Sequence, residues 1–114
     1  MMHRISFRSF DHRCIWVMGE LAPESTRAIL IEGMAPVSPA DLVRQANAHV
    51  YGPNFEFLDE LQVKQIHQAG LRVIPWTVND PADWQKLLDW GVDGITTDFP
   101  DRLAEFLSAK RIVY

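Results

Sequence analysis

The sequence contains a single cysteine, Cys14, and no long apolar run. One cysteine excludes an internal disulfide framework and most structural zinc sites, and it fits a reducing compartment. We expect Cys14 to be a small buried hydrophobic side chain, because no motif places a histidine beside it to make it a nucleophile. The apolar runs are short, such as residues 28–31, whereas a membrane-spanning helix needs about 20 residues. We therefore expect no transmembrane segment.

Basic residues are also few. The chain has 11 Lys and Arg against 15 Asp and Glu, which gives a net charge of −4. Because phosphate backbones are bound by basic surfaces, this balance argues against nucleic acid as a partner. The first residues lack the basic, apolar and small-residue pattern of a signal peptide, so we expect a cytoplasmic location. A glycine-rich phosphate loop of either standard type is also absent.

What is present is the composition of one globular domain. The 114 residues are 47% hydrophobic and 23% charged, which predicts a single domain over residues 1–114. Five short apolar runs have the character of strands. The predicted strands are Ile5–Phe10, Arg27–Ile31, His49–Tyr51, Arg72–Val78 and Gly94–Thr97.

Helix signals alternate with these runs. Serine or aspartate followed by proline or an acid marks helix starts at residues 38–41, 59–62 and 80–83, and glycines 70 and 91 mark helix ends. Pro100 begins the last predicted helix, and residues 11–18 form a weaker one that we expect to stop near Gly19 and Pro23. Strands that alternate with helices predict right-handed βαβ crossovers and a parallel sheet. Both an open doubly wound sheet and part of an eight-stranded barrel fit this pattern, but a full barrel needs about 250 residues.

Polar residues follow the last two predicted strands. Trp76, Thr77 and Asn79 end the stretch at residues 70–80, while Thr97 and Asp98 end the one at residues 90–101. Ligands of α/β folds bind at the carboxyl ends of strands. The sequence therefore predicts a site built from these two segments.

The same two stretches resemble the glycerophosphodiester phosphodiesterase family. Residues 76–79 read W-T-V-N and residues 91–100 read G-V-D-G-I-T-T-D-F-P, which is similar to the family's last two strands. Residues 9–11, S-F-D, look like the end of its fourth strand. The resemblance extends over nearly the whole chain and is most specific from residue 59 to 103.

The resemblance implies a fold and an activity. The fold is the carboxy-terminal part of a TIM (β/α)8 barrel, strands four to eight. The activity is a metal-dependent hydrolysis of glycerophosphodiesters to an alcohol and glycerol 3-phosphate, with two histidines as acid and base. A divalent cation, Mg2+ or Ca2+, would polarise the phosphoryl oxygens.

The family's catalytic motifs are not in this sequence. H-R-G, E-x-D, H-D and E-x-K are all missing, and His3-Arg4 is followed by Ile5 instead of glycine. We therefore expect a carboxy-terminal fragment that is inactive alone and supplies neither catalytic residues nor metal ligands. The four histidines have no ligand spacing; we expect His49 to be structural and His67 to be a solvated helix residue.

The resemblance implies pocket residues at four positions: Ser9, Phe10, Trp76 and Asn79. Thr77, Thr97 and Asp98 are expected to support them. Four of these residues have a plainer interpretation: Trp76 as a core tryptophan, Phe10 as a core phenylalanine of the strand, Asn79 as an Asx cap and Asp98 as a turn cap. Strand alternation groups Trp76 with residues 74 and 78 but does not tell which group faces the barrel interior.

Two further interpretations stay open. The chain is either part of a hydrolase acting on a small glycerophosphodiester, or a non-catalytic partial barrel. The second would self-associate or pair with a complementary barrel half, because a five-stranded parallel sheet has two open edges.

Overall fold

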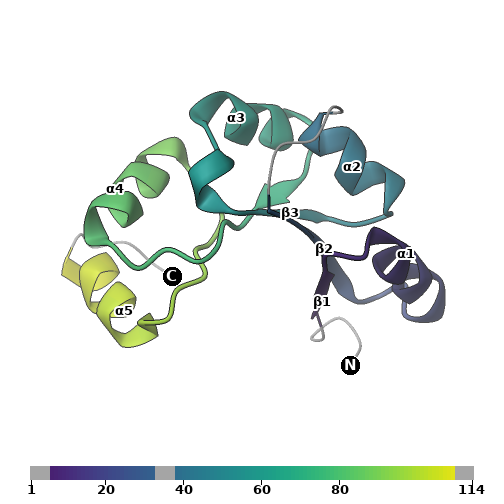
Figure 1. The fold of residues 1–114 in the computed structure, drawn as a ribbon, viewed down its shortest axis with the longest axis horizontal. Helices are drawn as coiled ribbons and strands as arrows, with labels where there is room; N and C mark the ends of the chain where they lie inside the picture. Colours follow the sequence, from purple (N-terminus) through teal and green to yellow (C-terminus); the bar gives the residue numbers. More distant parts are fainter. Residues whose placement is uncertain (1–5, 33–37, 110–114) are drawn as a thin grey trace.

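The structure is a computed structural model that describes residues 6–32 and 38–109. It is an alternation of parallel strands and helices, drawn in Figure 1. The start of the first predicted strand, Ile5, lies outside the described residues. The elements are β1 (Ser6–Ser9), α1 (His12–Leu21), β2 (Thr26–Ile31), α2 (Pro39–Gln45), β3 (Val50–Pro53), the 3-10 helix η2 (Phe55–Phe57), α3 (Glu60–Gln68), β4 (Arg72–Val73), α4 (Pro81–Trp90) and α5 (Pro100–Ala109).

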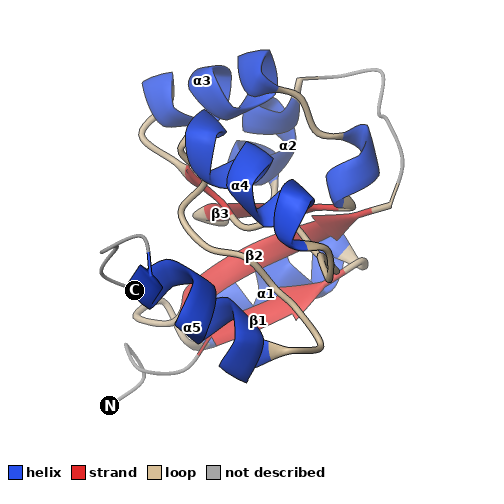
Figure 2. Ribbon diagram, turned by 90° about the vertical axis from the view of Figure 1, so that its left-hand side faces the viewer, coloured by secondary structure: helices blue, strands red, loops and turns tan. Residues whose placement is uncertain are grey.

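The strands form one parallel sheet in the order β1-β2-β3-β4. A doubly wound sheet reverses its strand order and carries helices on both faces. Here the described order runs one way, and the helices lie in an arc on the outside of the strands (Figure 1). Figure 2 shows the same arc from the side, with α4 and α5 towards the viewer and α1 behind the strands. The open doubly wound alternative is therefore wrong, and the predicted barrel-type repeats are confirmed.

The hydrophobic core lies between the helices and one face of the sheet, which we call the helix face. Ile29, Tyr51 and Val73 of the strands are buried there against α2, α3 and α4. The helices contribute Val43, Val63, Ile66, Trp84 and Leu87. The opposite face, which we call the inner face, carries Leu30 and Ile74, which stand outside this core. Burial therefore stabilises the described sheet from one side.

Helix starts follow the expected cap chemistry. Ser38 and Asp80 accept a backbone hydrogen bond and are followed by proline, and Asp59 forms a complete capping box with Gln62. Gly91 ends α4 in a left-handed conformation, with φ 82°.

The first helix is longer than predicted, since α1 continues through Gly19 and ends at Leu21, two residues before Pro23. A Cβ at Gly19 would lie 3.1 Å from side-chain atoms of Arg27 and Asn47. Glycine is therefore suited to close approach at this position and does not end the helix. The prediction for Cys14 is also wrong, because its side chain is exposed on α1.

The fourth and fifth predicted strands are shorter than expected, and prolines explain both. Pro53 has no N–H to donate to residue 74, so β4 is regular only at Arg72–Val73, although Trp76 still pairs with Asn54. Residues 94–97 form no regular strand. The Asp93 amide donates to the Val73 carbonyl, and the Thr96 amide donates to the Pro75 carbonyl. Three steps along the chain, from residue 93 to 96, are therefore paired with two steps, from residue 73 to 75. This one-residue slip is a β-bulge, and it occurs where Pro75 has no N–H to donate.

Arg27 on β2 is a buried cation, with 3% of its surface exposed. Its Nε donates to the Asn47 carbonyl at 2.9 Å, and its Nη1 donates to the carbonyls of Ser25, Pro23 and Ala22 at 3.0, 3.3 and 3.4 Å. Ala22 is the C-cap of α1. The guanidinium therefore joins the end of α1 to the segment before β3, at the negative end of the helix dipole.

We expect Arg27→Met to lower the free energy of unfolding by about 2–4 kcal/mol, because it leaves buried carbonyls without donors. Urea unfolding at neutral pH measures this change. Arg44→Met is the matched control: Arg44 is exposed and ion-paired at 3.8 Å with Asp41. Its loss should change stability by less than about 1 kcal/mol. Equal effects of the two substitutions would contradict the assignment.

Candidate functional site

Phe10 and Trp76 meet at the carboxyl ends of the strands. Phe10 follows β1 and Trp76 follows β4, and their ring centroids are 5.6 Å apart at an interplanar angle of 84°. The Trp76 Nε1 donates to the Gly52 carbonyl at 2.7 Å, which fixes the indole against β3. Phe10 is 57% exposed. Trp76 is half-buried and stands outside the helix-face core, so the core-tryptophan interpretation is wrong. Together the two rings form an aromatic wall.

Ser9 is not part of this wall. Its hydroxyl accepts a hydrogen bond from the Asp11 amide at 2.9 Å and so closes the turn into α1. Asp11 is the N-cap of α1, and hydrogen bonds from the side chain and backbone of Arg13 hold the pKa of its carboxyl below the ordinary value. The polar atoms at the end of β1 therefore serve the start of the helix.

Asn79 connects the two loops that contain the polar motifs. Its Oδ1 accepts hydrogen bonds from the Thr97 hydroxyl and the Asp98 amide, both at 3.0 Å, and its Nδ2 donates to the Asp98 carboxylate at 3.0 Å. The Thr97 hydroxyl also accepts from the Phe99 amide at 3.1 Å. This network, the Asn79 brace, joins three of the predicted residues. The plainer interpretation of Asn79 as an Asx cap is wrong, because Asp80 caps α4.

The alternation expected along residues 72–78 does not persist. Ile74 and Trp76 share the inner face, whereas Val78 is fully buried in the helix-face core. The Trp84 Nε1 donates to the Val78 carbonyl at 2.7 Å, which anchors this residue to α4. The slip at Pro75 and the turn into α4 break the period of two. Thr77 is exposed, and no hydrogen bond joins its side chain to the other described residues.

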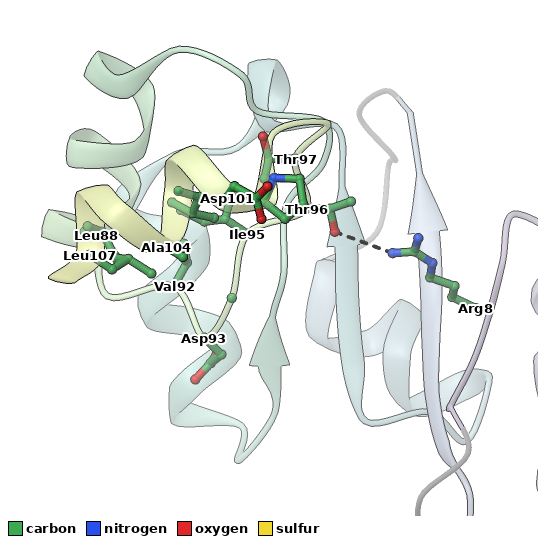
Figure 3. Close-up of a pocket in the computed structure, with 13 residues that line it drawn as sticks. Arg8, Leu88, Val92, Asp93, Ile95, Thr96, Thr97, Asp101, Ala104 and Leu107 are labelled. Carbon is green, nitrogen blue, oxygen red and sulfur yellow. Dashed lines mark hydrogen bonds between the residues drawn. The ribbon is translucent and has the colours of Figure 1, made fainter. Parts of the chain in front are cut away.

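Arg8 is a residue that the sequence analysis missed. Phe7 packs against the helix-face core, so alternation places Arg8 on the inner face of β1. Its Nη1 donates to the Thr96 hydroxyl at 3.5 Å (Figure 3). This hydrogen bond connects β1 with the segment at the opposite end of the arc. The signal was available, because Arg8 precedes Phe10 by two positions in a strand of period two.

A cavity of about 810 Å³ lies along residues 92–97, between this segment, α5 and Arg8 of β1. Its walls are mostly apolar side chains of α4, α5 and this segment, and its polar groups belong to Arg8, Asp93, Thr96, Thr97 and Asp101 (Figure 3). The aromatic wall does not line it. The cavity therefore marks the unpaired edge of the sheet, beside the predicted pocket.

Metal ligands and catalytic histidines do not gather at this site. Among residues 6–32 and 38–109, no three His, Cys, Asp or Glu side chains form a metal-binding group. The His12 Nε2 lies 3.1 Å from the Leu30 carbonyl, and the His67 Nε2 lies 2.8 Å from the Asp93 carboxylate. Burial, with the charges of Arg27 and Arg72, lowers the pKa of His49 below its ordinary value. The His49 Nδ1 also accepts a hydrogen bond from the Arg27 amide at 3.4 Å, so each of these three histidines has a partner.

A family model and several relatives identify the family of this chain. The model of the glycerophosphoryl diester phosphodiesterase family matches residues 2–102. A glycerophosphodiester phosphodiesterase of Bacillus subtilis is 32% identical over 101 residues, which are 86% of this chain and 34% of that protein. A phosphodiesterase of Oleispira antarctica, solved with its product sn-glycerol-3-phosphate, aligns with a TM-score of 0.83 at 23% identity. This alignment covers 90% of the present chain and 41% of the Oleispira chain. A glycerophosphodiester phosphodiesterase of Parabacteroides distasonis also aligns at 0.83 with 23% identity, over 96% of this chain and 45% of its own.

The chain thus spans less than half the length of each of these relatives. The alignments confirm the fold as a partial barrel. In the described part of the chain, the helices are too short or too polar to cross a membrane.

We expect Asn79→Ala to loosen the two loops without unfolding the protein. The substitution removes three hydrogen bonds of 3.0 Å at an exposed position, so the free energy of unfolding should fall by about 1–2 kcal/mol. The amides of Asp98 and Phe99 should exchange hydrogen at least about tenfold faster. Gln85→Ala, which removes one exposed bond to Asp89, is the control. Unchanged exchange at residues 98 and 99 would show that Asn79 does not hold the loop.

Proposed function

Because the chain belongs to the glycerophosphoryl diester phosphodiesterase family, we propose that it supplies the carboxy-terminal wall of a glycerophosphodiester-hydrolysing pocket. The reaction converts a glycerophosphodiester and water into an alcohol and glycerol 3-phosphate. The observation that carries this proposal is the aromatic wall, Phe10 and Trp76, at the carboxyl ends of parallel strands. In barrel folds this end holds the active site.

The residues of the chain have separate tasks in this proposal. The ring of Trp76 covers an apolar part of the substrate, while the hydrogen bond from its Nε1 to Gly52 keeps the ring in one orientation. The Asn79 brace acts indirectly, by holding the loops after residues 78 and 96 at a fixed separation. We propose that Ser9, Thr97 and Asp98 act in the same indirect way, through the hydrogen bonds of the turns in which they lie. Thr77 has no such bond among the described residues and takes no part in this proposal.

The described residues do not by themselves fit the divalent cation that the family implies. The carboxylate of Asp98, which belongs to the Asn79 brace, accepts a hydrogen bond from an amide, and no group of three possible ligands is found among the described residues. The motifs that carry the family's metal ligands are absent from this sequence. We propose that Mg2+ or Ca2+ is held by residues that this chain does not contain, and we assign no step to it here. A single domain and a cytoplasmic location also remain proposals.

A second candidate function is that of a non-catalytic module. The cavity beside residues 92–97 lies along a sheet edge that no described strand pairs. Exposed edges favour association, either with a second copy or with a complementary half-barrel. Light scattering of the purified chain distinguishes the two: a dimer supports the module, and a monomer at high concentration counts against it.

We expect the 114-residue chain alone to release no glycerol 3-phosphate from glycerophosphocholine, with Mg2+ or with Ca2+. The reason is that the sequence contains none of the motifs that carry the family's histidines and carboxylates. A coupled glycerol 3-phosphate assay checks this result. Metal-dependent release by the pure chain would contradict the proposed division of the site.

The pocket wall is tested in a chimaera. Residues 6–109 replace the matching region of the Bacillus subtilis relative, and the hybrid should regain metal-dependent hydrolysis. Trp76→Ala should then lower kcat/KM about tenfold or more, because the substrate loses a fixed apolar contact. Trp76→Phe, which keeps a ring, should lose less. Trp16→Ala is the control, since Trp16 is a half-exposed tryptophan on α1. Equal losses for Trp76→Ala and Trp16→Ala would refute the assignment of Trp76.

A further inference from the structure

Arg8 stands on the inner face, below the aromatic wall. It precedes Phe10 by two residues, and the sheet register places it beside Ala28 of β2. The neighbours of Ala28 along β2, Arg27 and Ile29, are buried on the helix face, so Ala28 and Arg8 share the inner face. The register places Val50 and Arg72 at the level of Arg8 and Ala28, and Leu30 and Gly52 two residues further along the strands.

Most other cations of the described chain have partners. Four form ion pairs with carboxylates: Arg13 with Asp11, Arg44 with Asp41, Lys64 with Glu60 and Lys86 with Asp83. Arg27 is held by carbonyls, and Arg102 lies 4.9 Å from the centre of the Phe99 ring. Among residues 6–32 and 38–109, Arg8 forms no ion pair, and its hydrogen bond to Thr96 is 3.5 Å long.

The direction of the side chain matters as much as its charge. Arg8 points from β1 towards Thr96, which belongs to the opposite end of the arc (Figure 3). The guanidinium therefore lies over the inner face, between the two ends of the sheet. A guanidinium has five N–H donors in a planar fork, and one long bond leaves the rest available.

We propose that Arg8 binds the phosphate of the phosphodiester substrate, a contact that rests on the proposed function. The Arg8 side chain is exposed on the inner face and has no carboxylate partner among the described residues, so its guanidinium is accessible to an anion. The planar fork matches two oxygens of a phosphate group. Phe10, two positions further along the same strand, then contacts the carbon part of the same molecule. One strand thus presents a charged contact and an apolar contact at adjacent levels of the pocket.

The isolated chain tests the contact directly. The 15N-labelled protein is titrated at constant ionic strength with glycerol 3-phosphate, inorganic phosphate and acetate, and the arginine Nε–H signals are followed by NMR. Comparison with Arg8→Gln assigns the Arg8 signal. We expect a saturable shift of this signal with both phosphates, and binding that is at least about tenfold weaker in Arg8→Gln. An equal shift with acetate, or no shift with either phosphate, overturns the proposal.

Arg44→Gln is the matched control. Arg44 lies on α2, away from the inner face, where it is exposed and ion-paired with Asp41 at 3.8 Å. The substitution removes the same charge as Arg8→Gln without changing the inner face. Phosphate binding should be unchanged in Arg44→Gln. If both substitutions weaken binding equally, the effect is one of net charge, and the assignment to Arg8 is wrong.

The chimaera separates this proposal from the proposed function. If the unmodified chimaera hydrolyses glycerophosphocholine, Arg8→Gln should raise KM about tenfold, and Arg8→Lys, which keeps the charge without the fork, should recover part of the loss. An active chimaera whose KM does not respond to Arg8→Gln refutes the role of Arg8 alone. An inactive unmodified chimaera refutes the proposed function, and the phosphate titration still decides the anion contact.

Discussion

One-sided burial is the constraint on which the rest of this structure depends. All the described helices pack against the same face of a parallel sheet, and the fully buried side chains Ile29, Val43, Val63, Val73 and Leu87 belong to that single interface. Buried apolar area is the main favourable term in folding, at about 25 cal/mol per Å². The helix face therefore sets the positions of the strands. The inner face contributes little to the core, so its side chains are free to serve a ligand.

This division explains which features are readable from the sequence. Helix starts depend on local chemistry, and Ser38, Asp59 and Asp80 each accept the backbone hydrogen bond that their motifs predict. The parallel order follows from the alternation of strands and helices. The choice between barrel and open sheet depended on the resemblance in residues 76–79 and 91–100, because alternation alone permits both.

The errors arise where a distant contact overrides a local signal. Gly19 resembles a helix stop, but the approach of Arg27 and Asn47 requires a small residue inside a continuous helix. The grouping of Trp76 with Val78 assumed an unbroken strand, whereas Pro75 introduces a slip and Val78 turns into the core. Cys14 is exposed because α1, which begins after the edge strand β1, buries little beyond Ile15 and Gly19. The residues that approach Gly19 are distant in the sequence, whereas Pro75 lies within the strand and its effect appears only in the pairing with residues 93–96.

The candidate site combines two kinds of restraint that differ in strength. The Trp76 indole has one short hydrogen bond of 2.7 Å to a backbone carbonyl and an edge contact with Phe10, so its position follows the sheet. The Asn79 brace consists of three bonds of 3.0 Å among exposed side chains and one exposed amide, where competition with water reduces the net gain of each. The wall is therefore the rigid component and the braced loops are the softer one. A ligand that contacts both would be positioned by the wall and would tighten the brace on binding, because its contacts add to bonds that are individually weak.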